Sequence, residues 1–550
     1  MEARTISAKR SASSAVGTGD ATLAQSFSGP PQPMNANEKI VMDAITFDDV
    51  LLLPRYSNVV PTEADTTTWL TRRIRLHIPL ISAPMDTVTE SALAIALAQE
   101  GGLGVIHRNM PPEIQAREVT KVKRSANGVI SDPMTLSPDD TVAKARQLMA
   151  RYHVSGFPVT HDAEAKGAVR GILTRRDLKF VENEQTRVGD VMTKDGLITA
   201  PAGTTLPEAE RILNANKIEK LLLVDDAGNL VGLITMNDID RLSQFPRACV
   251  DSRGRLRCGA AIGVDAYERA EAVVAAGADV LVVDTSHGHS ENVLRTVREL
   301  KKRHDIDVIA GNVATAEGAK ALAAAGADAV KVGIGPGSIC TTRVVTGVGV
   351  PQLSAVMNAV QGVAGTNCVV IADGGIRQSG DIAKAIAAGA SAVMMGSMFA
   401  GLDESPGEMV IRQGRRYKSY RGMGSEGAMN AGSADRYGQA NRTGSAAAGD
   451  SASRSAASDN ASAEIGKQKF VPEGVEGLVA ARGPLTEFVY QMVGGLRASM
   501  GYVGCRTLAE MQRDARFCRV SGATIVENHP HDIQLTKESP NYLVARQGLE

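Results

Sequence analysis

Short apolar runs alternate with longer amphipathic stretches along most of the chain after residue 78. Eight such runs, each dominated by Ala, Val, Ile, Leu or Met, occur at 79–83, 103–106, 260–264, 280–283, 308–310, 329–332, 369–372 and 392–395. The stretches 269–276 and 316–325 between them have the apolar spacing of helices. Strand–helix alternation predicts an α/β fold with a parallel sheet. Eight units without a dinucleotide-binding turn favour a closed (β/α)8, or TIM, barrel.

The alternation is interrupted once, between the second and third runs, by a region that repeats itself. The string Gly-Ile-Leu-Thr-Arg-Arg-Asp at 171–177 returns as Gly-Leu-Ile-Thr-Met-Asn-Asp at 232–238. Asp-Pro-Met-Thr at 132–135 returns as Asp-Val-Met-Thr at 190–193. Repetition of a whole strand–helix–strand unit predicts a separate small domain inserted in a barrel loop.

The inserted domain is expected to span 124–245, with repeats at about 124–183 and 184–245, which splits the barrel domain into 38–123 and 246–550. Within the repeats, two Thr/Asp pairs recur, and each pair suits a cap of the helix expected after it. These pairs are Thr174 with Asp177 and Thr235 with Asp238.

Two segments have the composition of chain that does not fold by itself. Residues 1–37 are rich in Ser, Ala, Gly and Pro and are expected to form a disordered extension. In 443–463, 14 of 21 residues are Ala or Ser, which predicts a mobile loop or insertion.

Charge, hydropathy and cysteine usage restrict the functional class. The formal net charge of −1 argues against nucleic-acid binding, and no apolar run approaches the roughly 20 residues of a membrane span. Six cysteines without a CxxC pair argue against a zinc site or a disulfide framework and for a reducing compartment. We therefore expect a cytoplasmic protein in which any cysteine chemistry belongs to a single thiol.

Cys340 is the strongest candidate for that thiol. It lies near the end of the glycine-rich loop GIGPGSICTT at 333–342, which follows the sixth apolar run and would lie at the carboxyl face of a barrel, where active sites form. A single cysteine is more often a small buried apolar residue, and this is our expectation for the other five cysteines. The loop context instead favours a nucleophile at Cys340.

Glycines also follow the seventh and eighth runs, in Asp373-Gly374-Gly375 and Gly396-Ser397. Each alone fits an ordinary turn, but together at adjacent strand ends they favour a phosphate site, with Asp373 placed to accept ribose hydroxyls.

Two other segments are candidates for ligand binding, and a pair of histidines beside one of them is not a candidate metal site. The GxGxxG string at 422–427 follows no apolar strand and opens no clear helix, so a ligand-approaching loop is favoured over a dinucleotide fingerprint. Asp284-Thr285-Ser286 closes the fourth run and offers a carboxylate and hydroxyls to a ligand. His287 and His289 have no third metal ligand at suitable spacing.

These motifs together resemble inosine-5′-monophosphate (IMP) dehydrogenases. The resemblance rests on the Cys340 loop, on Asp-Gly-Gly-Ile-Arg at 373–377, on Tyr-Arg-Gly-Met-Gly-Ser at 420–425 and on Ile-Thr-Phe-Asp-Asp-Val-Leu-Leu-Leu-Pro at 45–54. It runs from about residue 43 to the carboxyl end, and the repeats resemble a pair of CBS motifs. Guanosine-monophosphate (GMP) reductases share much of the motif set but are expected to lack the CBS pair.

The resemblance implies a two-step reaction at Cys340. The thiolate adds to C2 of the hypoxanthine base, hydride passes to NAD, and the resulting thioimidate is hydrolysed to xanthosine monophosphate. Thr342 would assist hydrolysis. Arg436 and Tyr437, on a mobile flap at 436–471, would activate water after entering the emptied nicotinamide site. An arginine is an improbable base by its ordinary pKa, so this assignment rests on the resemblance.

The resemblance also assigns the remaining contacts. Substrate contacts fall on Ser338, Asp373, Gly374, Gly375, Gly396, Ser397, Tyr420, Arg421, Gly422, Met423, Gly424 and Glu473. NAD contacts fall on Asp284, Thr285, Ser286, Gly333, Ile334 and Gly335. A monovalent cation, usually K⁺, is implied at Gly335, Gly337 and Cys340. Its remaining ligands would be Glu527, Asn528 and His529 of a neighbouring subunit. This shared site implies a homotetramer, and two tetramers could pair into an octamer.

Two other functions stay open on the sequence alone. A GMP reductase would use NADPH and need no Arg436-Tyr437 pair, since its reaction has no hydrolytic step. A nucleotide sensor would act through ATP or GTP at the Thr174/Asp177 and Thr235/Asp238 positions. The chain also departs from the family in its longer amino-terminal tail and in its extended flap at 438–470.

Overall fold

The computed structural model describes residues 39–125, 130, 133–152, 154–236, 239, 244–439, 470–537 and 539–542. The chain divides into the units Met1–Asp43 and Ala44–Glu550, and all the helices and strands named below belong to the second unit. The predicted tail at 1–37, the Ser/Ala-rich stretch at 443–463 and Asp238 lie outside the described residues.

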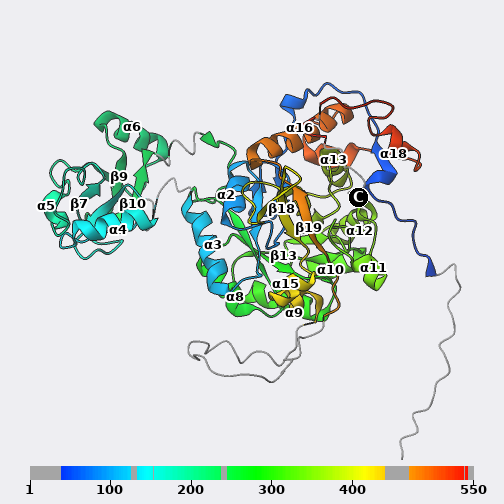
Figure 1. Ribbon diagram of the computed structural model, residues 1–550, viewed down its shortest axis with the longest axis horizontal. Coiled ribbons are helices and arrows are strands. Elements are labelled where there is room, and N and C mark those ends of the chain that lie inside the picture. Colours follow the sequence, from blue (N-terminus) through cyan, green and yellow to red (C-terminus); the bar gives the residue numbers. More distant parts are fainter. Residues whose placement is uncertain are drawn as a thin grey trace, which may run out of the picture. The chain divides into compact units, whose positions relative to one another are not determined.

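A closed barrel of eight parallel strands forms the centre of the fold (Figure 1), in the order β11-β12-β13-β14-β15-β16-β4-β5. The predicted TIM-type barrel is confirmed, and each predicted apolar run overlaps one strand. The strands are β4 (Leu80–Ser82), β5 (Leu103–Ile106), β11 (Cys258–Ile262), β12 (Val280–Asp284), β13 (Asp307–Val313), β14 (Ala329–Val332), β15 (Val369–Asp373) and β16 (Ala392–Met395). Their side chains are almost all buried, because one face meets the barrel interior and the other meets helices.

The helices between the strands cover the barrel with their apolar faces. The predicted helices at 269–276 and 316–325 are α8 (Tyr267–Ala275) and α10 (Ala316–Ala324). At the start of α10 the Thr315 side chain accepts a hydrogen bond from the amide of Gly318, which caps the helix. The other covering helices are α2 (Ser91–Gln99), α3 (Pro112–Ser125), α9 (Glu291–Arg303), α12 (Gln352–Val363), α13 (Ser379–Ala387) and α16 (Leu485–Val503).

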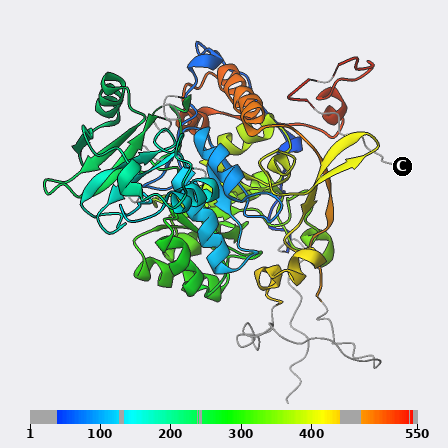
Figure 2. The ribbon, with the colours of Figure 1, turned by 60° about the vertical axis from the view of Figure 1, so that its left-hand side comes forward.

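A three-stranded antiparallel sheet joins two segments that lie apart in the sequence. It consists of β17 (Met409–Arg412), β18 (Arg415–Arg421) and β19 (Glu476–Ala480), and Figure 2 shows the first two side by side in yellow. No apolar strand was expected before the GxGxxG string, and the strand that precedes it, β18, is polar. The expectation that the string opens no clear helix was wrong, because the short helix α15 (Glu426–Asn430) begins within it. The sheet is antiparallel, so the string is still not part of a dinucleotide-binding βαβ unit.

The inserted region contains two matching halves. The first holds α4 (Val142–Tyr152), β6 (Gly156–Thr160) and β7 (Val169–Thr174), and the second holds β8 (Thr199–Pro201), α6 (Leu206–Asn216), β9 (Lys220–Val224) and β10 (Leu230–Thr235). The repeated strings lie on β7 and β10. Apolar side chains from both halves form one cluster: Ile172, Leu222, Leu230 and Leu233. The two repeats therefore fold against each other, although the domain limits at 124 and 245 stay predictions.

The first Thr/Asp pair of the insertion differs from its expected role. The Asp177 carboxylate accepts hydrogen bonds from the Thr174 amide at 2.6 Å and hydroxyl at 2.8 Å, and from the Thr193 hydroxyl at 3.1 Å. Residues 175–180 form turns, so the helix expected after this pair is absent. The carboxylate therefore stabilises a turn.

Candidate active site

One pocket opens at the carboxyl ends of the barrel strands and contains most of the predicted site residues. Its walls come from the loops after β4, β12, β14, β15 and β16, from Asn312 of β13, from 420 and 422–424, and from the two stretches 436–437 and 473–474. Strands far apart in the sequence end at this one face because the barrel is closed and parallel. The loops that the sequence placed at the carboxyl face therefore line one pocket, and the roles assigned to their residues stay predictions.

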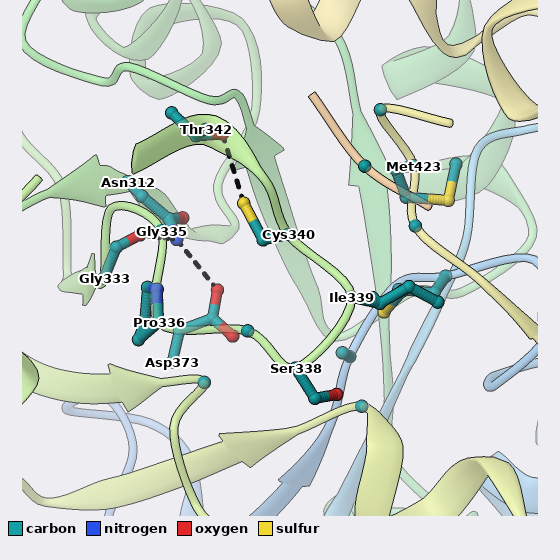
Figure 3. Close-up of a pocket in the computed structure, with 18 of the residues that line it drawn as sticks. Asn312, Gly333, Gly335, Pro336, Ser338, Ile339, Cys340, Thr342, Asp373 and Met423 are labelled. Carbon is teal, nitrogen blue, oxygen red and sulfur yellow. Dashed lines mark hydrogen bonds between the residues drawn. The ribbon is translucent and has the colours of Figure 1, made fainter. Parts of the chain in front are cut away.

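Cys340 lies on the wall of this pocket, half-buried, with its sulfur beside the Thr342 hydroxyl (Figure 3). Its Sγ donates to the Thr342 hydroxyl at 3.1 Å, and that hydroxyl donates to the Glu473 carboxylate at 2.8 Å. The backbone holds this chain of groups in place, since the Thr341 amide donates to the Glu473 carbonyl at 3.0 Å. The thiol is thus linked to a carboxylate through one hydroxyl.

Four of the other five thiols differ from Cys340 in their surroundings. Cys249, Cys258, Cys368 and Cys505 are buried. Burial raises the pKa of Cys249 and of Cys368 to about 12, and it also raises that of Cys258. Thiols with such values stay protonated at neutral pH and are poor nucleophiles. Cys518 is half-buried like Cys340, but its sulfur contacts the Leu51 carbonyl at 3.6 Å and does not line the pocket.

The loops after β15 and β16 form the wall predicted to hold a phosphate. Gly374 and Gly375 have φ values of +84° and +80°, the left-handed region in which glycine is favoured. A Cβ on Gly396 would lie 2.9 Å from both the Tyr420 hydroxyl and the Met85 sulfur. Only a residue without a side chain allows this close approach. The Gly374 amide donates to the Met394 carbonyl at 3.2 Å.

The two neighbouring residues Tyr420 and Arg421 face different surroundings. Tyr420 is buried in the pocket wall, and burial raises the pKa of its phenol, while a hydrogen bond from Ser338 opposes that rise. Arg421 was predicted as a substrate contact, but it does not line the pocket. Its guanidinium binds Asp86 at 2.6 Å, and this hydrogen bond raises its pKa. Asp86 was not identified from the sequence.

Beneath the pocket lies a buried network that sequence reasoning missed. Lys331 of β14 is completely buried, and its ammonium lies 2.7 Å from Asp373 and 3.0 Å from Asp284. It also donates to the side chain of Asn312. The Asn312 amide donates to Asp373 at 3.0 Å, as Figure 3 shows, and to the Gly333 carbonyl at 2.7 Å. One cation therefore holds a carboxylate from each of two strand ends.

The segment at 433–437 closes the side of the pocket assigned to NAD. It forms a short 3-10 helix, η3 (Ser433–Tyr437), and its Arg436 forms an ion pair with Asp284. The amide and hydroxyl of Ser286 both donate to the Arg436 carbonyl, at 3.1 and 3.0 Å. Two residues expected to contact NAD thus bind the flap arginine in this structure.

Arg108, from the loop after β5, holds the neighbouring residue of the same segment. Its guanidinium donates to both oxygens of Asp435, at 2.9 and 2.7 Å, and this pair was not found from the sequence. Tyr437 packs over Gly424, where a Cβ would lie 2.8 Å from the phenol oxygen. Side-chain contacts therefore hold η3 on the pocket.

Burial changes the acid–base properties of the flap pair. Burial lowers the pKa of Arg436, and the charge of Arg108 lowers it further, while the charge of Tyr437 and its hydrogen bond oppose this. Burial raises the pKa of Tyr437, and the charge of Arg436 opposes that rise.

The residues of the implied cation site lie in two parts of the chain. Gly335, Gly337 and Cys340 share the pocket loop, while Glu527, Asn528 and His529 lie at and after the end of α18 (Thr524–Glu527). The latter were assigned to a neighbouring subunit, so the grouping stays a prediction. Among the described residues, no cluster of three His, Cys, Asp or Glu side chains suits a metal, and no helix is long and apolar enough to cross a membrane.

Comparison with known proteins gives consistent matches over most of the chain. The family model described as "IMP dehydrogenase / GMP reductase domain" matches residues 44–531. The inosine-5′-monophosphate dehydrogenase of Rhodopirellula baltica is 58% identical to this chain, in a match that covers 94% of this chain and 92% of that protein. The inosine-5′-monophosphate dehydrogenase of Aquifex aeolicus is 54% identical, in a match that covers 92% of this chain and 99% of that protein. A cysteine-to-alanine variant of GMP reductase from Trypanosoma brucei, solved with guanosine 5′-monophosphate, superposes with a TM-score of 0.80 at 39% identity, covering 91% of this chain and all of that one.

The match to the trypanosomal reductase corrects one expectation. Residues 124–245 make up more than a fifth of this chain, so a coverage of 91% requires a counterpart of the insertion in that protein. The expectation that GMP reductases lack such an insertion was therefore wrong for the trypanosomal reductase, and the insertion alone does not separate the two activities.

Proposed function

The chain belongs to the IMP dehydrogenase and GMP reductase family, and from that premise we propose that it oxidises IMP to xanthosine monophosphate with NAD, a step of guanine nucleotide synthesis. The observation that carries the proposal is the position of Cys340, on the pocket wall and hydrogen-bonded through Thr342 to Glu473. The nucleophile is thereby connected, through the Thr342 hydroxyl, to a carboxylate that can accept its proton before substrate binds.

The first half-reaction uses the thiol. As the Cys340 proton leaves, by way of Thr342 and Glu473, the sulfur forms a bond to C2 of the base, and the C2–N3 π bond opens with its electron pair moving to N3. The C2 hydrogen then departs with its electron pair while the C2–N3 π bond re-forms, and NAD supplies the hydride acceptor when bound. This leaves a thioimidate on Cys340. The Thr285 and Ser286 side of the pocket is where we place the acceptor.

The second half-reaction cleaves the sulfur–carbon bond. Water adds at C2, the sulfur leaves as thiolate, and the water gives up protons to groups of the chain. We assign Arg436 and Tyr437 to orient this water, because both line the pocket that also holds Cys340. A guanidinium paired with Asp284 is a weak base, so the Thr342–Glu473 pair is a second route for the proton.

The nucleotide is held by the opposite wall. The backbone of Gly375 and Gly396 and the Ser338 hydroxyl suit the phosphate, and Asp373 suits the ribose hydroxyls. Gly374 lines the same wall, although its amide donates to the Met394 carbonyl. Gly396 and Ser397 begin the short helix α14 (Ser397–Ala400), and phosphate sites in barrels of this type often form there.

Three finer assignments belong to the same proposal. We assign K⁺ to the carbonyls of Gly335, Gly337 and Cys340, completed by 527–529 of a neighbouring copy, and therefore a homotetramer. We assign ATP or GTP to the inserted repeats. ATP and GTP should then shift thermal stability or oligomer size, and Asp177→Ala combined with Asp238→Ala should remove that shift. An unchanged response in this double variant would contradict the assignment.

GMP reduction is the second candidate, and the reductase superposition supports it. The position of Arg436 favours the dehydrogenase, since a reductase has no water to activate. The curated relatives at 52–58% identity carry the dehydrogenase name.

The deciding experiment is an absorbance assay at 340 nm. Protein with IMP, NAD and K⁺ should form NADH, and Cys340→Ser should lower the rate at least about 10³-fold, since it removes the nucleophile. Cys518→Ser is the matched control, because Cys518 is also half-buried but lies outside the pocket. If wild type forms no NADH with IMP but consumes NADPH with guanosine 5′-monophosphate, the second candidate is correct.

A further inference from the structure

Two lysines are buried in the barrel, and each holds two carboxylates. Lys123, in the last turn of α3, lies 3.1 Å from Asp251 and 2.9 Å from Asp279. Lys331, under the pocket, lies 3.0 Å from Asp284 and 2.7 Å from Asp373. Both ammonium groups are almost fully removed from water, so each depends on its carboxylates for stability.

The charge balance of the two clusters differs. Around Lys123, Arg255 also binds Asp251, at 2.9 Å, so two cations face two carboxylates. Around Lys331 a single cation faces two carboxylates, which leaves a net charge of −1. Of the described residues, only Arg436 adds a second cation to this group, through its pair with Asp284. The Lys331 cluster is therefore neutral only when η3 lies on the pocket.

The fit of Arg436 in this position is incomplete. Its Nε is buried and has no hydrogen-bond partner among the described residues. A buried polar atom without a hydrogen bond costs free energy. The guanidinium therefore balances the charge of Asp284 without saturating its own hydrogen bonds, and another cationic group could take its place.

We propose that Lys331 is a positioning residue that leaves one uncompensated carboxylate, Asp284, for which Arg436 and the cationic ring of an oxidised nicotinamide compete. This inference rests on the proposed function. The oxidised ring carries a positive charge and the reduced ring carries none. Hydride transfer then removes the attraction that Asp284 exerts on the cofactor, and Arg436 gains access to the same charge for the hydrolytic half-reaction.

Comparing the binding of NAD, whose nicotinamide ring is cationic, with that of NADH, whose ring is neutral, tests the competition for Asp284. With Cys340→Ser preventing turnover and IMP saturating, calorimetry at pH 8 measures the Kd of NAD and of NADH. Lys331→Met removes one positive charge, so the ratio Kd(NADH)/Kd(NAD) should rise about tenfold, while Lys331→Arg should preserve it. A purely structural role would weaken both ligands equally. A ratio within twofold of the Cys340→Ser parent in Lys331→Met overturns the proposal.

Lys123→Met is the matched control, because it removes the same kind of ammonium at the opposite end of the barrel and should leave the ratio unchanged. If Lys331→Met does not fold, the near-isosteric Asp284→Asn decides, since losing the carboxylate should lower the ratio about tenfold. An unchanged ratio there also overturns the inference. Failure of the proposed function would be distinct, since wild type would then form no NADH from IMP.

Discussion

The two walls of the pocket are built in different ways. The wall that suits the nucleotide consists of strand ends and backbone amides of the barrel, with glycines at 374, 375 and 396. The opposite wall consists of η3, which is held by ion pairs of Arg436 and Asp435 and by hydrogen bonds from Ser286. A reaction with a lasting covalent intermediate needs one wall that keeps the nucleotide bound throughout, here called the fixed wall. It also needs a second wall that can move away to admit the cofactor and return for hydrolysis, here called the exchangeable wall. This difference in construction therefore matches the two half-reactions that we propose.

The largest expected effect comes from the exchangeable wall. Arg436→Gln keeps a side chain that can hydrogen-bond but removes its charge, so hydrolysis should slow by about 10²-fold or more. The first turnover should still form NADH, which a rapid-mixing experiment would record as a burst of one equivalent per site. Loss of the burst together with the steady rate would mean that Arg436 also serves the nucleotide wall.

The pKa of Arg436 gives this variant a pH signature. Burial lowers that pKa, and the neutral form that can accept a proton increases as pH rises. Hydrolysis in wild type should therefore accelerate with pH on the alkaline side, and the Arg436→Gln profile should be flatter there. Parallel alkaline limbs in both proteins would place the base elsewhere, with Thr342 and Glu473 as the candidates.

Gly396→Ala tests the fixed wall. The added Cβ would lie 2.9 Å from the Tyr420 hydroxyl and the Met85 sulfur, so the wall must shift. We expect the KM for IMP to rise about tenfold with little change in the KM for NAD. Gly380→Ala, in α13, is the control, since a Cβ there meets nothing within 4 Å. A larger change in the KM for NAD than for IMP would contradict the division into two walls.

The fixed wall was also the one that the sequence made visible. Strands buried on both faces appear as unbroken apolar runs, and the polar or glycine residues that follow them, such as Asp373 and Gly396, stand out at their ends. The strand β18 was missed for the opposite reason, because Arg415–Arg421 is a polar, partly exposed strand with no apolar run.

Ion pairs between distant segments were beyond sequence reasoning. Arg108 and Asp435 are 327 positions apart, and neither belongs to a motif. Lys331 left a weak signal, a charged residue in the centre of the run Ala-Val-Lys-Val. A lysine in a strand that is buried on both faces needs a carboxylate partner, but only the closed barrel identifies Asp284 and Asp373 as the partners.

Exchanging the charges of Arg108 and Asp435, the pair that holds η3, should have a moderate effect on kcat. Arg108→Asp places two carboxylates together and should lower kcat about tenfold by weakening the η3 contact. Adding Asp435→Arg should restore part of the rate. Arg73→Asp is the control, since its pair with Asp305 lies at the amino-terminal end of the barrel. If the double variant is no faster than Arg108→Asp alone, the pair does not hold η3 through charge.

The smallest effect is expected at Gly263, which follows β11 and lies against the same pair. A Cβ there would be 2.8 Å from Asp435 Oδ2 and 3.2 Å from Arg108 Nη1, both ends of flexible side chains that can move aside. Gly263→Ala should therefore lower kcat only about twofold and leave the KM for IMP unchanged, because the nucleotide wall is untouched. Steady-state kinetics beside Gly380→Ala resolve such a difference. A rise in the KM for IMP instead would show that the two walls are mechanically coupled.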